Sequence, residues 1–208
     1  VGKPVLGRRV WGYLGMRPPG RTAAGAQYVR VRSDRLAPAP DGVPLAEAAA
    51  LPLAGLTAVQ ALRPLERRRG NRVLVVGGNG GVGSTGVQVA RIMGGEVDAV
   101  VGVRSDVAVS AGARRVFDYH DLKPSDVPGS YDVVVDTAGV DALAYRRLLK
   151  PGGRMAAIAP GAFWDIVKSM FSPGPMIRMV SGKPSVKDLM WLAARVDSGE
   201  LKPLIAST

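Results

Sequence analysis

The sequence contains no cysteine and only one histidine, His120. Disulfides and thiolate metal sites are therefore excluded for this chain, and no His/Cys cluster is present to hold zinc. His120 follows Tyr119 in a polar stretch, where a partly exposed loop histidine is expected. We therefore expect no metal site.

Aromatic residues and long apolar runs are also scarce. Phe, Trp and Tyr make up 5% of the chain, and the most apolar long stretch, residues 43–62, is interrupted by Glu47 and Pro52. This stretch falls short of a membrane span. The chain begins without a charged segment followed by an apolar one, so no signal peptide is visible. These absences lead us to expect a soluble cytoplasmic protein.

Acidic residues are outnumbered by basic ones, 17 to 28, which gives a net charge of +11. Such a charge suits nucleic acid, a membrane surface or anionic ligands. The arginines, however, form scattered short clusters without an interleaved aromatic motif. A solvated basic surface is therefore favoured over nucleic-acid binding.

Glycine and proline are abundant, with 27 and 16 residues, and 47% of the chain is hydrophobic. This composition indicates an α/β protein with many turns and a proper core. The length of 208 residues fits one large domain, or one domain and a fragment of another.

The central motif lies in residues 72–90. The apolar run Val73 to Val76 predicts a strand buried on both faces, and Gly78, Gly80 and Gly83 follow with the G-x-G-x-x-G spacing. In this motif the first glycine allows the turn, the second admits a pyrophosphate, and the third lets the helix pack closely. An ordinary glycine-rich turn is the alternative. The preceding strand and the amphipathic helix expected from Gly81 favour dinucleotide binding.

Beyond this unit, apolar strands and helical segments alternate. Strands are predicted at 97–101, 115–117, 132–135, 154–158 and 176–180, and helices near 106–111, 142–149, 162–171 and 186–196. This order predicts an α/β Rossmann fold, with a doubly wound, parallel, six-stranded sheet.

The two ends of the chain follow other patterns. Residues 9–13 and 26–31 are predicted to be short strands, and residues 201–205 the start of another strand. Residues 45–65 are helix-prone, with expected breaks at Pro52 and Gly55. Within 162–171, apolar residues at helical spacing form a large face, for which core or a subunit interface is favoured over a wall of a substrate pocket; they are Phe163, Trp164, Val167, Met170 and Phe171.

The cofactor type is predicted from the end of the second strand of the sheet. An Asp or Glu there usually binds a free ribose 2′-hydroxyl, but residues 102–105 contain no carboxylate. Asp98 lies inside the strand, too early to reach the ribose. Arg104 offers a forked cation that suits a 2′-phosphate, so NADPH is favoured over NADH. A plain surface arginine is the alternative.

Several pieces of the sequence together resemble the medium-chain dehydrogenase/reductase superfamily, in its zinc-independent, quinone-oxidoreductase-like branch. In order they are GAQYV (25–29), AAALPLAGLTA (48–58), GGVG (80–83) with Gln88, DY (118–119), YDVVVDT (131–137) and LKPGGR (149–154). Where zinc-dependent relatives carry a metal-binding cysteine, this chain has Leu53.

The resemblance implies three parts and two missing ends. Residues 1–45 would be the tail of a GroES-like catalytic domain, residues 46–198 the NADP-binding Rossmann domain, and residues 199–208 the start of the return to the catalytic domain. The segments that position substrate in relatives would lie largely before residue 1.

The resemblance also implies a cofactor site. Thr57 would lie near the nicotinamide, and Arg104, Ser105 and Tyr119 would surround the adenosine 2′-phosphate. The pyrophosphate would lie on the turn made of Gly78, Asn79, Gly80, Gly81 and Val82, and the nicotinamide ribose would be bordered by Thr137, Ala138 and Ala159. No proton donor is assigned, since structural roles are favoured for Tyr13 and Tyr28.

The activity implied is hydride transfer from NADPH to a quinone or an α,β-unsaturated carbonyl, by an enzyme that is commonly a homodimer. The alternative is a non-catalytic NADPH-binding protein with a structural, sensory or RNA-interacting role.

Overall fold

The computed structural model describes residues 6–15, 25–63, 70–102 and 105–205. Its centre is a six-stranded parallel sheet, as predicted. The strands are β3 (Arg72–Val76), β4 (Glu96–Val101), β5 (Arg115–Asp118), β6 (Tyr131–Asp136), β7 (Leu149–Ala157) and β8 (Ile177–Met179). They lie in the order β5-β4-β3-β6-β7-β8, so the order reverses between β3 and β6.

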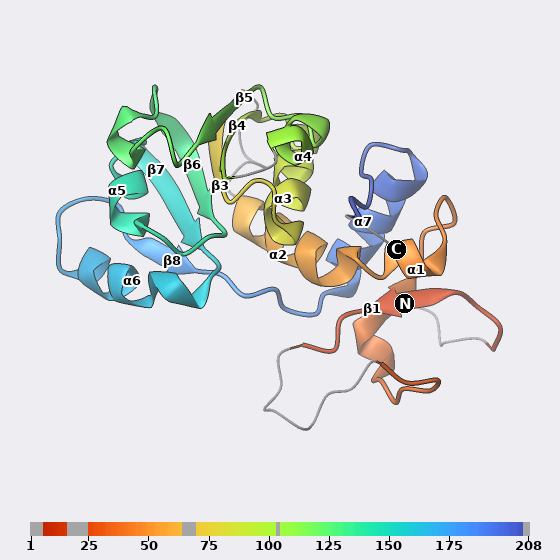
Figure 1. Cartoon of the computed structure of the whole chain (residues 1–208). Helices are drawn as coiled ribbons and strands as arrows, with labels where there is room; N and C mark the ends of the chain where they lie inside the picture. The colour runs from red at the N-terminus through yellow and green to blue at the C-terminus, as the bar shows by residue number, and fades with distance from the viewer. Residues whose placement is uncertain (1–5, 16–24, 64–69, 103–104, 206–208) are drawn as a thin grey trace.

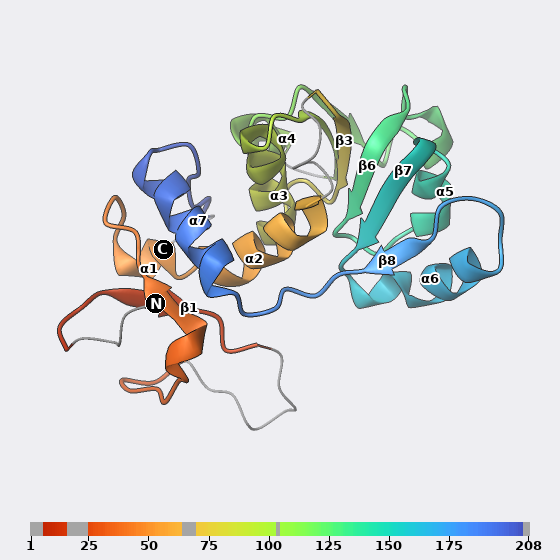
Figure 2. The same cartoon turned by 180° about the vertical axis from the view of Figure 1, so that it is seen from behind.

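Helices cover both faces of the sheet, because the central strands are apolar on both sides. Val73 and Val75 of β3 belong to the cluster on one face, and Leu74 and Val76 to the cluster on the other. The first face is covered by α2 (Leu51–Leu62), α3 (Gly81–Ile92) and α4 (Ser105–Ser110), and the second by α5 (Ala142–Arg146) and α6 (Phe163–Met170) (Figures 1 and 2).

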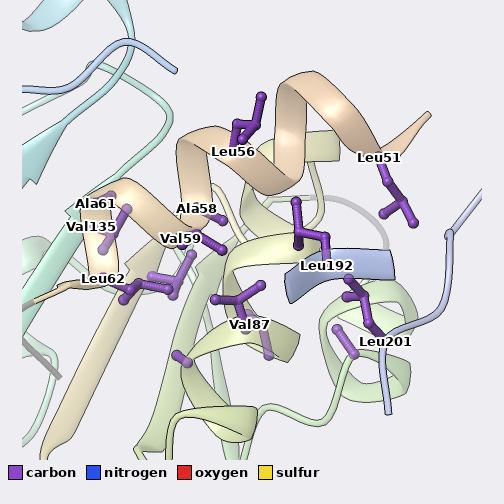
Figure 3. Packing of buried hydrophobic residues seen from close by; sticks show 14 of the residues in the cluster. Leu51, Leu56, Ala58, Val59, Ala61, Leu62, Val87, Val135, Leu192 and Leu201 are labelled. Carbon is purple, nitrogen blue, oxygen red and sulfur yellow. The ribbon is translucent and has the colours of Figure 1, made fainter. Parts of the chain in front are cut away.

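The larger core lies between α2, α3 and the last helix, α7 (Val186–Asp197). In Figure 3, Val59 and Leu62 of α2 lie close to Val87 of α3, and Leu192 of α7 lies below α2. Asp188 ties the last helix to α2 through two Arg63 bonds of 2.8 and 2.9 Å. The predicted amphipathic helix at 186–196 is thus a core element.

The helix-prone segment 45–65 differs from its prediction. It forms α1 (Leu45–Ala48) and α2, and the break falls at residues 49–50 rather than at Pro52 and Gly55. Proline is tolerated in the first turn of a helix, where its missing N–H is not needed. Gly55 makes room for α7, because an added Cβ would lie 2.7 Å from Leu192 Cδ1 and the buried leucine would have to shift.

The stretch Leu45–Leu62 also reaches the length and hydropathy of a membrane span, with a mean hydropathy of 1.4 over 18 residues. Of this stretch 61% is buried inside the protein, and the turn at residues 49–50 divides it. Both features are those of a core helix of a folded domain.

The first part of the chain corrects another prediction. β1 (Val10–Gly12) pairs antiparallel with β2 (Leu36–Pro38), whereas residues 26–31 form no strand, and residues 26–30 are exposed. The β-rich composition of 26–31 was misleading, because a strand also needs a partner. Residues 201–205, predicted to begin a strand, form none either. In Figure 1, β1 and α7 lie near the end of α2 that points away from the sheet.

The apolar face predicted on α6 points outward, so its assignment to the core of this chain is wrong. Trp164 is 68% exposed and Phe171 85%. Toward the sheet, α6 contributes the half-buried Ile166, which packs against the second cluster, and the buried Ser169, whose Oγ accepts from the N–H of Ile177 in β8 at 3.1 Å. An interface remains a prediction for the exposed face.

Candidate functional site

The turn after β3 is built by glycines that the structure requires for different reasons. Gly77 has φ of +83°, and its N–H and that of Gly78 both donate to Val100 O, at 2.8 and 3.0 Å. The left-handed turn therefore lies at Gly77, one residue before the predicted position. Gly78 is needed for space, because an added Cβ would lie 2.8 Å from Ala99 Cβ.

The third glycine of the motif allows the close approach that was predicted. An added Cβ at Gly83 would lie 1.9 Å from Gly77 O, a contact that no side chain can make. At Gly81, by contrast, nothing lies within 4 Å of an added Cβ. The turn is thus tight on the sheet side and open on the side where α3 begins, which leaves room for an anion against the backbone N–H groups.

A cleft of about 440 Å³ opens at the carboxyl ends of β3, β4 and β6. It lies where the strand order reverses, the place at which open α/β sheets bind ligands. It is lined by the end of β3 and the turn after it, by Gly102 after β4, and by residues from the segments 119–124 and 137–145. Its residues are Val76, Gly77, Asn79, Gly80, Gly102, Tyr119, Leu122, Pro124, Thr137, Ala138, Val140, Asp141 and Tyr145.

The loop after β6 is fixed by two side chains. Thr137 Oγ1 donates to Val76 O, at 2.8 Å, which ties the loop to the end of β3. Asp136 Oδ1 accepts from the N–H groups of Ala138 and Gly139, at 2.9 and 2.8 Å. Burial raises the pKa of the Asp136 carboxyl, although these two hydrogen bonds lower it in part. The loop is thereby held in one conformation beside the cleft.

On the opposite wall, Tyr119 packs against the end of β4. An added Cβ at Gly102 would lie 2.6 Å from Tyr119 Cε1, so a side chain there would displace the Tyr119 ring. His120 is exposed and its ring centroid lies 4.2 Å from that of Tyr119. The single histidine is therefore a loop residue beside Tyr119, as predicted.

The structure brings together part of the predicted cofactor site. Asn79, Gly80, Tyr119, Thr137 and Ala138 line the cleft. Gly78, Gly81, Val82 and Ala159 are not among the residues that line it. Arg104 lies outside the described residues, and Ser105 is the first residue of α4.

Thr57, the residue expected near the nicotinamide, does not line this cleft. It is buried in α2, where its Oγ1 donates to Leu53 O at 2.8 Å. An added Cβ at Gly182 would approach Thr57 Oγ1 to 2.4 Å, so Thr57 faces the segment that joins β8 to α7. Its role at a nicotinamide stays a prediction.

Sequence reasoning missed several cleft residues. Gly77 could have been found, since it adjoins the first glycine of the motif. The others carry no local signal, because they reach the cleft through the loops after β4, β5 and β6; they are Gly102, Leu122, Pro124, Val140, Asp141 and Tyr145. No group of three or more His, Cys, Asp or Glu side chains that could hold a metal occurs among the described residues.

Together the sheet order, the glycine turn and the cleft define the class: a dinucleotide-binding protein of the Rossmann type. The sequence model of a family described as "Zinc-binding dehydrogenase" matches residues 111–208.

Individual relatives agree with this class. The chain is 33% identical, over 183 residues, to an NADPH-dependent alkenal/one oxidoreductase, chloroplastic, of Arabidopsis thaliana, and 32% identical, over 187 residues, to a 2-methylene-furan-3-one reductase of Solanum lycopersicum. Each match covers 86% of this chain and 44% of the relative. The chain thus spans about half the length of these curated relatives.

Among solved structures, the quinone oxidoreductase from Coxiella burnetii superposes with a TM-score of 0.88 at 25% identity, over 99% of this chain and 65% of the other. These matches identify the chain as a quinone-oxidoreductase-like member of the medium-chain dehydrogenase/reductase superfamily.

Proposed function

We propose that the protein is an NADPH-dependent, zinc-independent oxidoreductase that transfers a hydride to a quinone or to an α,β-unsaturated carbonyl. The observation that carries the proposal is the cleft at the strand-order reversal, with its glycine turn open toward the start of α3. The names of the Arabidopsis and tomato relatives support reduction of enone-type substrates.

The residues of the turn fit a dinucleotide. Gly83 and Gly78 leave no space for a Cβ on the sheet side, whereas Gly81 faces open space where a pyrophosphate would lie. The cofactor supplies the hydride, and the protein orients it and excludes water. In this proposal Thr137, Ala138 and Ala159 border the nicotinamide ribose, and Thr57 lies near the nicotinamide. Arg104, Ser105 and Tyr119 hold the 2′-phosphate.

The remaining assignments belong to the same proposal. Residues 1–45 and 199–208 would belong to a GroES-like catalytic domain and residues 46–198 to the NADP-binding domain. The exposed apolar face of α6, next to the edge strand β8, would form a homodimer interface. A monomeric mass in sedimentation experiments would contradict the dimer. The proposed location is the cytoplasm, although the Arabidopsis relative is named as chloroplastic; cell fractionation would decide it.

The first prediction tests the cofactor. Arg104→Asp is expected to weaken NADPH binding about tenfold or more and to leave NADH binding unchanged or tighter, because it places a carboxylate where the 2′-phosphate would lie. Titration that follows nicotinamide fluorescence measures both. Arg178→Asp is a matched control, since Arg178 is exposed on β8 at the other edge of the sheet.

Equal binding of NADPH and NADH by the wild type, unaffected by the change at Arg104, would refute the NADPH assignment. Turnover is tested by NADPH consumption with a panel of quinones and enones, using a chain extended to the relatives' length. Binding without consumption there would support the non-catalytic alternative instead.

A further inference from the structure

One part of the cleft has a chemistry that the glycine turn does not explain. The loops after β5 and β6 form the wall of the cleft that does not belong to this turn. This wall combines the apolar side chains of Leu122, Pro124 and Val140 with the ring of Tyr119. Such a wall suits a flat, mostly apolar ring. A single carboxylate, Asp141, also lines this part of the cleft.

The backbone of Asp141 is unusual. It has φ of 52° and ψ of 36°, and among the described residues no other non-glycine residue has a positive φ. Asp and Asn tolerate this left-handed conformation better than most residues, although it still costs about 1 kcal/mol. The backbone carbonyl oxygen of Asp141 is hydrogen-bonded: it accepts from the N–H groups of Ala144 and Tyr145, at 2.9 and 3.1 Å.

The carboxylate of Asp141 is not used in the same way. It makes no capping bond to α5, and among the residues that the structure describes none donates a hydrogen bond to it or forms an ion pair with it. Beside it, burial first, and then the negative charges of Asp141 and Asp136, raise the pKa of Tyr145 to about 12. The Tyr145 phenol therefore stays neutral at neutral pH, beside the exposed side chain of Asp141.

The chemistry of this arrangement narrows the ligand group that can lie there. A carboxylate only accepts hydrogen bonds, so it repels phosphate and carbonyl oxygens and favours an N–H donor. Of the parts of a nicotinamide dinucleotide, the adenine ring is flat and carries an exocyclic amine. The pyrophosphate is accommodated elsewhere, at the open turn of Gly80 and Gly81.

We propose that Asp141 determines the base specificity of the cleft, by accepting a hydrogen bond from the exocyclic amine of adenine and by disfavouring a base with a carbonyl at that position. This inference rests on the proposed function, since it assumes a dinucleotide in the cleft. In this arrangement the apolar wall packs against the adenine ring, and Asp141 recognises the amine at the edge of the ring.

The test compares NADPH with its deamino analogue, in which hypoxanthine replaces adenine and a carbonyl replaces the amine. Titrations that follow nicotinamide fluorescence should show that the wild type binds NADPH about five- to tenfold more tightly. Asp141→Asn should remove this preference, because an amide can either donate or accept. Asp141→Gly should remove it too, and glycine adopts the positive φ without strain.

Asp41→Asn is the control for the loss of one charge, since the Asp41 side chain is 92% exposed and far from the cleft in the first part of the chain. It should keep the wild-type preference. Equal binding of both dinucleotides by the wild type, or an unchanged preference in the two Asp141 variants, would overturn the inference and leave the proposed function standing. Binding of neither dinucleotide by the wild type would overturn both.

Discussion

The two ends of the central sheet each contain a fully buried aspartate, and the two carboxylates differ in how completely they are hydrogen-bonded. Asp98 lies in the amino-terminal half of β4, and Asp136 is the last residue of β6; both side chains have 0% exposure. They belong to the two strands that flank β3. Because the two side chains are equally buried, the difference in their hydrogen-bond partners goes with the end of the sheet at which each lies.

At the amino end, the carboxylate is fully paired. Asp98 accepts from Arg115 at 2.7 Å and from the Tyr131 hydroxyl at 3.0 Å, and Arg114 and Arg72 lie within 3.5 and 3.6 Å. Burial alone would raise the pKa of the Asp98 carboxyl, but the hydrogen bonds from Arg115 and Tyr131 lower it below its usual value. This end of the sheet satisfies its own charges.

At the carboxyl end, pairing is incomplete. Asp136 Oδ1 accepts two backbone hydrogen bonds, whereas Oδ2 has no hydrogen-bond partner in the described part of the chain. The pKa of this carboxyl is accordingly raised by burial. The buried carboxylate at the amino end is therefore paired, whereas at the carboxyl end Asp136 Oδ2 is left without a hydrogen bond next to the cleft.

The largest predicted effect concerns the amino end. Asp98→Asn should lower the free energy of unfolding by about 3 kcal/mol, because it removes the buried charged partner of Arg115. Urea denaturation measures the loss. Glu96→Gln is the matched control: Glu96 lies on the same strand and pairs with Arg114, but it is half exposed, so it should cost less than about 1 kcal/mol. Equal losses would mean that burial of the pair contributes nothing.

The second prediction concerns the glycine turn at the carboxyl end. Gly83→Ala should cost up to about 3 kcal/mol of stability and also weaken NADPH binding, because the added methyl displaces Gly77 O and thus the turn. Gly86→Ala, in the same helix but with nothing within 4 Å of an added Cβ, should instead stabilise by about 0.5 to 1 kcal/mol. Similar behaviour of the two variants in denaturation and titration would contradict the assigned close approach.

The smallest prediction is a pH dependence of opposite sign at the two aspartates. Burial raises the folded pKa of Asp136 above its ordinary 3.8, so its contribution to stability is present below pH 3.8 and is lost as the pH rises through the raised pKa. Asp136→Asn cannot ionise, so its free energy of unfolding should rise relative to that of the wild type as the pH increases from 3.8 through the raised pKa. Each unit of pKa shift corresponds to about 1.4 kcal/mol.

For Asp98 the pKa is lowered, so the stabilisation is present above the ordinary value and is lost as the pH falls through the lowered one. The deficit of Asp98→Asn should accordingly shrink in acid. Denaturation curves at several pH values measure both variants. The same sign for both would remove the distinction between the two ends.

Much of the fold could be predicted because its signals are local. The run Val73 to Val76 and the glycines after it indicated β3, the turn and α3, and the alternation of strands and helices indicated a six-stranded parallel sheet. The failures occurred where a partner decides the outcome. Residues 26–31 have strand-like composition but no strand beside them, and Gly55 could remain inside α2 because Leu192 fills the space.

The candidate site was predictable only in its glycine part. Asn79 and Gly80 belong to a contiguous motif, and the resemblance to a family supplied Tyr119, Thr137 and Ala138, which do line the cleft. Nothing in the sequence distinguished Asp141 from other acidic residues, or the buried Asp136 from the buried Asp98.

The sequence by itself determined the strand-turn-helix unit, the parallel sheet and the absence of cysteine ligands, because backbone freedom, apolar periodicity and composition act within a short stretch of chain. Only the tertiary structure decided which loops meet at the cleft, that α6 exposes its apolar face, and that one buried aspartate is paired while the other is not. Those outcomes depend on contacts between residues distant in sequence, and such contacts are fixed only when the sheet has assembled.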